Sequence, residues 1–266
     1  MAERLKDKVA LVTGAGAVGP GWGNGKATAV LFAREGASVF AVDINPAAAD
    51  ETRAIIEGEG GTCRVHAADV TDGAQVKGMV NACLEAFGRI DILHNNVGGS
   101  IPGGPVELTE DQWNDQLRYN LTSVFLTCKH TIPVMERQGG GAVVNVASLA
   151  AIRHTGHYHA AYEAAKAGLI HFTRTLGVQY APKGIRCNTV IPGHVFTPLV
   201  ETRLAKQYRG GSIEDLIAAR SKGVPMGRMG DAWDVAYAAL FLASDEAGYV
   251  TATEIVADGG VIAKCD

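Results

Sequence analysis

The chain has 266 residues, of which 47% are hydrophobic, and its formal net charge is −4. This size and composition suit one large α/β domain, or two small ones, with a well-buried core. No block of like charge stands out, so we expect neither nucleic acid nor an anionic membrane as a partner.

Short β-branched apolar segments alternate along the chain with stretches whose apolar residues recur at helical spacing. The predicted strands cover 8–14, 37–43, 62–70, 90–96, 141–148, 185–192 and 254–260, and the predicted helices cover 26–36, 72–88, 110–138 and 160–181. Continuous apolar strands between helices indicate a parallel sheet that is buried on both faces. The sequence therefore predicts a doubly wound α/β fold of about seven strands with helices on both faces, in a single domain over residues 1–266.

Glycine follows several predicted helices, at Gly36, Gly88 and Gly139, as a helix C-terminus prefers. The least regular part of the chain is 196–230, and long loops of this kind often cover a site.

A dense glycine run follows the first predicted strand. The segment 13–26 contains six glycines, which is typical of a backbone that approaches a ligand closely. It is not a P-loop, because Pro20 and Ala27 stand where that motif requires glycine and Ser or Thr. Gly14, Gly16 and Gly19 match the dinucleotide fingerprint G-x-G-x-x-G.

The next helix is expected to start later than this fingerprint, because Pro20 and Gly21 follow it at once. Asn24 is a good N-cap, with Gly25 and Lys26 in the first turn. The free N–H groups and positive dipole end of such a helix would face an anion, as pyrophosphate recognition requires.

Asp43 ends the second predicted strand, twenty residues after Gly23. An acidic residue at this distance binds the ribose hydroxyls of NAD and repels the 2′-phosphate of NADP. The neighbouring Ile44 and Asn45 supply no cation for that phosphate. We therefore expect NAD as the cofactor, the alternative role of Asp43 being a simple strand-end cap.

Tyr162 and Lys166 belong to the stretch YEAAK, and their spacing places both side chains on one face of a helix. A tyrosine has an ordinary pKa near 10, and a neighbouring ammonium group is expected to lower the pKa of Tyr162 toward neutrality. A surface tyrosine beside a lysine is the alternative reading of the same pair. Ser148 ends the fifth predicted strand, where its hydroxyl could donate to a substrate oxygen.

Taken together, these motifs resemble those of the short-chain dehydrogenase/reductase family from about residue 5 to the C-terminus. TG…GNGKA is similar to the family's T-G-x-x-x-G-x-G turn, although Gly14 and Gly23 lie nine residues apart, five more than in the pattern. Trp22, in this extension, would lie over the cofactor or near the substrate, or else pack on its own turn. Ser148 and Tyr162 are fourteen residues apart, about one more than the family's usual gap.

The resemblance implies a Rossmann-type fold and a role for each matching residue. Ser148, Tyr162 and Lys166 would be catalytic together with Asn120, whose helix kink and bound water connect Lys166 to solvent in the family. The implied cofactor contacts are Gly14, Gly16, Gly23, Asn24, Gly25, Asp43, Ile44, Asp69, Val70, Asn96, Val97, Gly98, Tyr162, Lys166, Pro192, Gly193, Val195 and Thr197.

The implied activity is hydride transfer between NAD(H) and a secondary alcohol or ketone, with Tyr162 as general base or acid. Two alternatives stay open: an NAD-retaining isomerase, epimerase or dehydratase, and a non-catalytic dinucleotide sensor. The family also implies a homotetramer.

Three histidines, His154, His157 and His159, lie close together in the loop that lines the family's substrate site. We expect no metal there, because the proposed chemistry needs none; instead His154, His157, His194 and Ser100 are substrate-contact candidates. The predicted pocket wall also includes Val97, Gly99, Phe196 and Leu199, a mixed surface that selects no particular alcohol.

The five cysteines are far apart and form no C-x-x-C pair, which indicates neither a zinc site nor a disulfide framework. The N-terminus has no signal-peptide pattern, and no apolar run reaches the ~20 residues of a membrane span. We therefore expect a cytoplasmic protein with reduced cysteines.

Overall fold

The computed structural model describes residues 3–200, 202 and 212–265. Its centre is a sheet of seven strands, all parallel, in the order β3-β2-β1-β4-β5-β6-β9. The strands are β1 (Val9–Thr13), β2 (Ser38–Asp43), β3 (Cys63–Ala67), β4 (Ile92–Asn95), β5 (Gly141–Val146), β6 (Ile185–Pro192) and β9 (Glu254–Ala257). The predicted doubly wound α/β sheet of about seven strands is confirmed.

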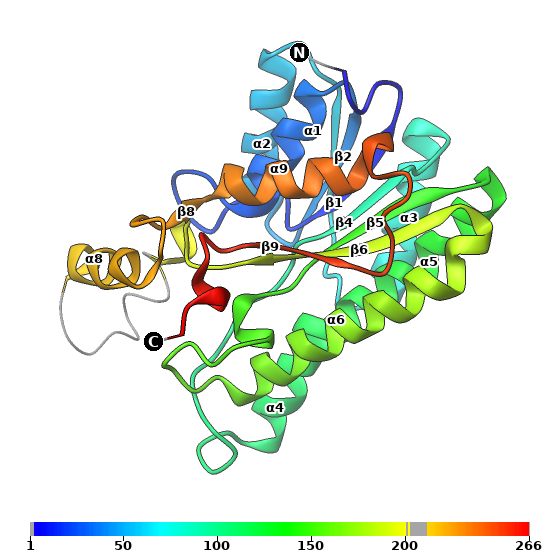
Figure 1. The fold of residues 1–266 in the computed structure, drawn as a ribbon. Coiled ribbons are helices and arrows are strands. Elements are labelled where there is room, and N and C mark those ends of the chain that lie inside the picture. The colour runs from blue at the N-terminus through cyan, green and yellow to red at the C-terminus, as the bar shows by residue number, and fades with distance from the viewer. Residues whose placement is uncertain (1–2, 201, 203–211, 266) are drawn as a thin grey trace.

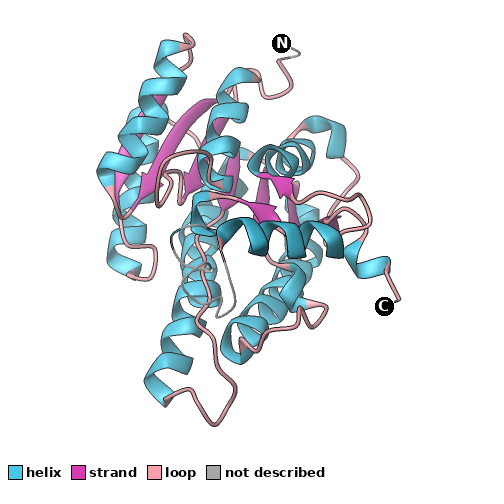
Figure 2. Cartoon of the chain, turned by 90° about the vertical axis from the view of Figure 1, so that its left-hand side faces the viewer, coloured by secondary structure: helices cyan, strands magenta, loops and turns pink. Residues whose placement is uncertain are grey.

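Helices cover both faces of this sheet (Figures 1 and 2). One face carries α1 (Asn24–Arg34), α2 (Pro46–Gly58) and α9 (Ala232–Ala243), and the other carries α3 (Gly73–Phe87), α5 (Ser123–Gln138) and α6 (Ala160–Tyr180). Each face has its own apolar core, because the side chains of a strand alternate between them. In β1, Leu11 packs with α3 and α5, while Val12 packs with α1 and α9.

One predicted helix is interrupted, and the glycines predicted to follow helices do so. The predicted helix 110–138 consists of α4 (Glu110–Leu117), a π-helical turn at Arg118–Thr122 and α5. Gly36, Gly88 and Gly139 all have positive φ just after helices, as predicted.

Three helices, α2, α8 (Ile213–Gly223) and α9, were not predicted from the sequence. α8 lies in the irregular segment 196–230, next to a two-strand pair formed by β7 (Val195–Phe196) and β8 (Gly230–Asp231). In Figure 1, α8 and β8 lie at one end of the sheet. Short 3-10 turns at Leu149–Ala151, Ala181–Lys183, Asp245–Ala247 and Val261–Ala263 complete the described structure.

Candidate active site

Two cavities lie beyond the carboxyl ends of the strands, where an open parallel sheet binds its ligand. Their volumes are about 440 and 290 Å³. Both are lined by Asn24, Asn96, Gly98, Thr197 and Leu199, so they form one continuous cleft. We call the larger one the substrate cavity and the smaller one the nucleotide cavity.

The glycine-rich turn forms part of the nucleotide cavity. Gly14 has a φ of +64°, in the left-handed region that glycine adopts most readily. α1 begins at Asn24, as expected, but Gly23 is its N-cap and Asn24 its first helical residue. The predicted N-cap role of Asn24 is therefore wrong by one position. A Cβ on Gly25 would lie 1.9 Å from the Gly14 carbonyl oxygen, so only glycine allows the turn to close against α1.

Trp22 lies outside the lining of both cavities. Its ring packs against Trp233 at the start of α9, with 4.7 Å between the ring centroids. The Lys26 ammonium lies 5.6 Å from the Trp22 centroid and 3.2 Å from the Glu51 carboxylate. The extension of the turn is thus anchored to α9, and the packing interpretation of Trp22 is the one that the geometry supports.

Asp43 lies at the end of β2, in the wall of the nucleotide cavity together with Ile44. Its two carboxylate oxygens accept the N–H groups of Gly16 and Asn45, each at 3.0 Å. The carboxylate therefore holds the glycine turn while it remains partly exposed to the cavity.

The next two strand ends reach the same cavity. Asp69 and Val70 follow β3, and Asn96 and Val97 follow β4. Asn96 donates from its side chain to the Gly14 carbonyl at 3.1 Å, which connects β4 to the turn after β1. The predicted nucleotide-contact residues are thus brought together at one edge of the sheet.

Asn120 lies in the π-helical turn between α4 and α5 and is completely buried. Its side chain exchanges two hydrogen bonds with Gly99, accepting from the N–H and donating to the carbonyl, both at 3.0 Å. π-helical turns occur often at functional sites. Here the turn brings the Asn120 amide onto the loop after β4, next to Lys166: a Cβ on Gly98 would lie 3.0 Å from Asn120 Oδ1 and 2.9 Å from Lys166 Nζ.

Lys166 is buried on α6, and its ammonium donates to the Val146 carbonyl at 2.8 Å. Burial lowers the pKa of Lys166 to about 8, because the charged form is poorly solvated there. The amine can thus exchange a proton near neutral pH.

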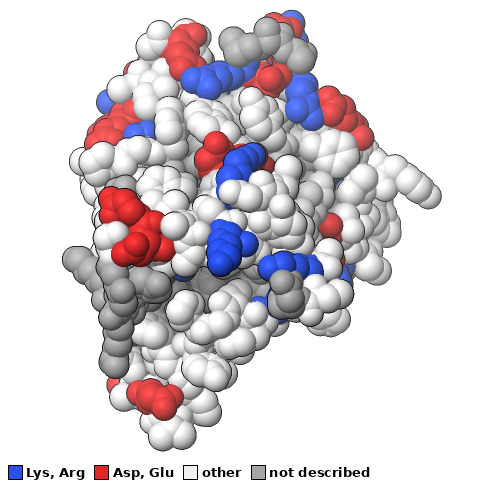
Figure 3. All heavy atoms as spheres, turned by 60° about the vertical axis from the view of Figure 1, so that its left-hand side comes forward, with Lys and Arg blue, Asp and Glu red and all other residues white. Residues whose placement is uncertain are grey.

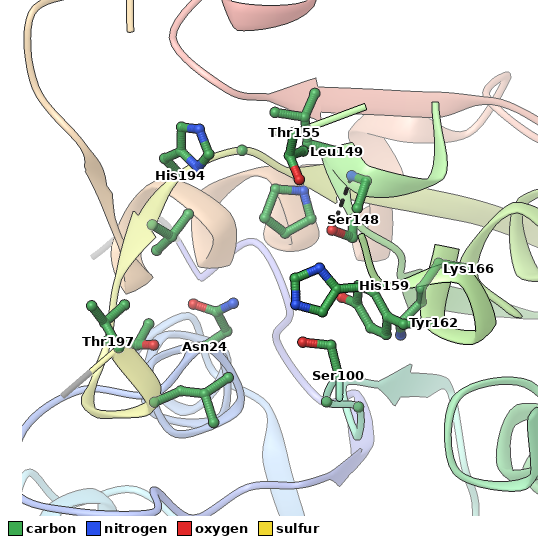
Figure 4. A pocket seen from close by; sticks show the side chains of 18 of the residues that line it. Asn24, Ser100, Ser148, Leu149, Thr155, His159, Tyr162, Lys166, His194 and Thr197 are labelled. Carbon is green, nitrogen blue, oxygen red and sulfur yellow. Dashed lines mark hydrogen bonds between the residues drawn. The ribbon is translucent and has the colours of Figure 1, made fainter. Parts of the chain in front are cut away.

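Tyr162 and Ser148 meet in the substrate cavity, where Figure 4 shows both side chains. Burial raises the pKa of Tyr162, and its hydrogen bond with Ser148 lowers it. The expectation that Lys166 lowers the pKa of Tyr162 is not met, because desolvation dominates and Lys166 donates to a backbone carbonyl instead. Ser148 also accepts the Ala150 N–H at 3.2 Å, which fixes its hydroxyl at the end of β5.

Pro192, Gly193, Val195 and Thr197 follow one another along the cavity wall after β6. A Cβ on Gly193 would lie 2.6 Å from Asp258, so this segment passes directly against the loop after β9.

Only some of the predicted substrate-contact residues line the substrate cavity. Ser100, His157 and His194 line the substrate cavity, whereas His154 and Phe196 do not. The His154 ring instead packs against Tyr158, with 5.2 Å between centroids. The prediction for His154 is therefore not supported, because its ring packs on Tyr158 and is not part of the cavity lining.

Several residues of this wall were not predicted from the sequence. His159 faces the cavity between Ser100 and Ser148 in Figure 4. Leu149, Thr155, Val200, Leu216, Ala219 and Arg220 also line it. The last three belong to α8, which lies far along the chain, and the sequence offers no motif that would place it here.

Charged side chains of both signs form small groups on the face seen in Figure 3, and uncharged atoms cover most of it. Within 3–200, 202 and 212–265, no three His, Cys, Asp or Glu side chains are arranged to hold a metal ion. None of the helices described in these ranges is long and apolar enough to cross a membrane.

The residues fit a nicotinamide dinucleotide on structural grounds. The first turn of α1 has free N–H groups at the centre of the cleft. Asn24 Oδ1 is buried there without a hydrogen-bond partner among the described residues, and a partly exposed carboxylate lies at the far end. A parallel sheet with this cleft, and a Ser-Tyr-Lys group in the cavity wall beside it, defines the class of dinucleotide-dependent oxidoreductases.

Comparison with known proteins is consistent with this class. Residues 19–262 match the family model described as enoyl-(acyl carrier protein) reductase. A 2,5-dichloro-2,5-cyclohexadiene-1,4-diol dehydrogenase of Sphingobium indicum is 36% identical over 98% of both chains. The chain belongs to the short-chain dehydrogenase/reductase family.

Solved structures of the family are similar throughout. A Burkholderia xenovorans chain assigned to the short-chain dehydrogenases/reductases is 54% identical, with a TM-score of 0.95 over 99% of both chains. The carveol dehydrogenase of Mycobacterium avium, crystallised with NAD, is 30% identical, with a TM-score of 0.90 over 98% of this chain and 99% of that one.

Proposed function

We propose that this protein interconverts a secondary alcohol and its ketone with NAD as cofactor, and that Tyr162 is the general base and acid. The observation that carries the proposal is the meeting of Tyr162, Ser148 and Lys166 in one cavity that is continuous with the nucleotide cavity. When bound, the cofactor supplies a nicotinamide ring that accepts or donates the hydride.

The protein's own residues bind the substrate and move the proton. Ser148 donates its hydroxyl hydrogen bond to the substrate oxygen and stabilises the charge that develops there. Tyr162 removes the alcohol proton in oxidation and returns it to the ketone oxygen in reduction. Burial raises the pKa of Tyr162, which favours the phenol over the phenolate.

Lys166 and Asn120 act behind Tyr162. Lys166, with its pKa lowered to about 8, exchanges protons in the working range and lies beside the loop that Asn120 holds at Gly99. These two residues would pass the proton between Tyr162 and solvent.

NAD preference rests on Asp43, the carboxylate at the ribose end of the nucleotide cavity. The NAD-bound carveol dehydrogenase supports the same choice by analogy. The cofactor contacts would come from the glycine turn, the ends of β2, β3 and β4, and the segment after β6. A cytoplasmic homotetramer completes the proposal, and gel filtration with light scattering tests its size.

The substitution Tyr162→Phe tests the proposal directly. It removes the phenol oxygen alone, and general acid–base catalysis of this kind contributes ~10²–10⁴-fold. NADH formation with a panel of secondary alcohols should fall by that factor. Tyr158→Phe is the matched control, since Tyr158 lies on the neighbouring loop and is 75% exposed. Full activity of Tyr162→Phe would refute the role of Tyr162, and product formation without net NADH would indicate the isomerase alternative.

A further inference from the structure

The substrate cavity is lined by basic side chains and by no acidic one in the part of the chain that the structure describes. The described residues that line it include one lysine, one arginine and three histidines. No Asp or Glu is among these lining residues. Lys166 and His159 lie near Tyr162, but Arg220 and His194 belong to other elements. A wall of this composition complements an anion rather than a plain alcohol.

Arg220 lies in the last turn of α8 and is partly buried. It has no hydrogen bond or ion pair with any residue that the structure describes. Arg186 is also desolvated, but its guanidinium donates to the carbonyls of Leu242 and Ser244 at 2.7 and 3.0 Å. A guanidinium has five donors, and burying them without acceptors is unfavourable. Arg220 thus presents to the cavity a guanidinium that is unpaired among the described residues.

His194 and His157 lie near Arg220 in the same wall. Burial lowers the pKa of His194 most, and the charges of Arg220 and His157 lower it further. The carboxylate of Asp258 acts in the opposite direction, but its two oxygens accept the N–H groups of Gly260 and Ile262 at 2.8 and 2.7 Å. No ion pair joins Asp258 to Arg220 among the described residues, and burial favours the neutral imidazole of His194, which can donate a hydrogen bond.

Building on the proposed function, we propose that the substrate carries a carboxylate, which Arg220 binds with the help of His194 and His157. The carbinol carbon then lies against Ser148 and Tyr162 in the same cavity. A planar guanidinium pairs with a carboxylate through two parallel hydrogen bonds, which fixes orientation as well as affinity. The cavity volume of about 440 Å³ accommodates a ring or short chain between the two groups.

The kinetic test compares 3- and 4-hydroxycyclohexanecarboxylate with their methyl esters in the wild type and in Arg220→Gln. Hydrogen bonds to a charged group contribute ~1.5–3 kcal/mol, equivalent to about 10–150-fold. We expect the wild type to prefer the acids over the esters by such a factor in kcat/KM. Arg220→Gln should abolish that preference, mainly through KM.

Lys222→Gln is the matched control, because Lys222 is exposed on the same helix and outside the cavity lining. It removes the same charge and should keep the preference for acids. If Arg220→Gln lowered kcat/KM equally for the acids and their methyl esters, Arg220 would have a structural role and the proposal would be overturned. A raised KM for NAD alone would place Arg220 on a cofactor phosphate and would also overturn it.

A binding measurement separates this inference from the proposed function. Calorimetric titration with cyclohexanecarboxylate and with cyclohexanecarboxamide needs no turnover. In Tyr162→Phe, the carboxylate should still bind more tightly than the amide, and the added substitution Arg220→Gln should remove the difference. Equal binding of both probes would refute the anion site even if alcohols are oxidised. Carboxylate selectivity without any alcohol oxidation would leave the anion site intact and refute the proposed function.

Discussion

The role of Asp43 in cofactor choice can be tested by changing its charge alone. In Asp43→Asn the side chain keeps its size and can still accept hydrogen bonds through one oxygen. A carboxylate offers about four acceptor sites, and Gly16 and Asn45 occupy one on each oxygen. About two sites therefore remain for the two ribose hydroxyls of NAD.

The magnitude follows from these remaining sites. Hydrogen bonds to a charged acceptor contribute ~1.5–3 kcal/mol each, and a neutral one contributes ~1 kcal/mol. The variant loses two charged hydrogen bonds and keeps at most one neutral one, so the net cost is at least ~2 kcal/mol, or roughly 30-fold in kcat/KM for NAD. The activity with NADP should not fall by this factor, since the variant removes the charge that repels the 2′-phosphate. The ratio of kcat/KM values for NAD and NADP should thus shift by roughly 30-fold or more.

The assay measures kcat/KM for both cofactors with one alcohol, together with the thermal midpoint of unfolding. Asp69→Asn is the matched control, because Asp69 lines the same cavity but its Oδ1 accepts the N–H and hydroxyl of Thr71, both at 2.8 Å. An equal loss with NAD and NADP would refute the reasoning. Asp43 would then act by holding the Gly16 turn, and a lowered unfolding midpoint would accompany the loss.

Two further predictions concern pH. Ser148→Ala removes the hydrogen bond that lowers the pKa of Tyr162, so the rise of kcat/KM for alcohol oxidation with pH should move to higher pH; an unmoved profile would contradict the link. His94 is fully buried in β4, and burial lowers its pKa from 6.5 to about 3. In the unfolded chain the imidazole of His94 keeps its ordinary pKa near 6.5, so it is protonated at a higher pH than in the folded protein. The free energy of unfolding therefore decreases as the pH falls from 6.5 toward 3, by about 3 kcal/mol at pH 4.5. Urea denaturation should show His94→Leu gaining about this much relative to wild type between pH 7 and pH 4.5, and a constant difference would count against the argument.

Several features could be predicted because they are local in the sequence. β-branched apolar runs define buried parallel strands whatever their neighbours are, and the spacing of Tyr162 and Lys166 fixes a shared helix face. The start of α1 at Asn24 could be predicted because Pro20 prevents an earlier one. Helix α9 was missed for a related reason: it is apolar almost all round, so no polar face gives it a helical period.

Other features depend on contacts between distant segments. The pKa of Tyr162 follows from burial and from Ser148, not from the lysine one helical turn away. His154 and His157 are neighbours in sequence, yet only His157 reaches the cavity. Arg220 enters the wall because α8 lies over the ends of the strands. The sequence alone determined the fold class and the chemical groups, since these depend on residue type and period. Only the tertiary structure decided how each group is solvated and paired, because burial and partners are set by the packing of segments far apart in the chain.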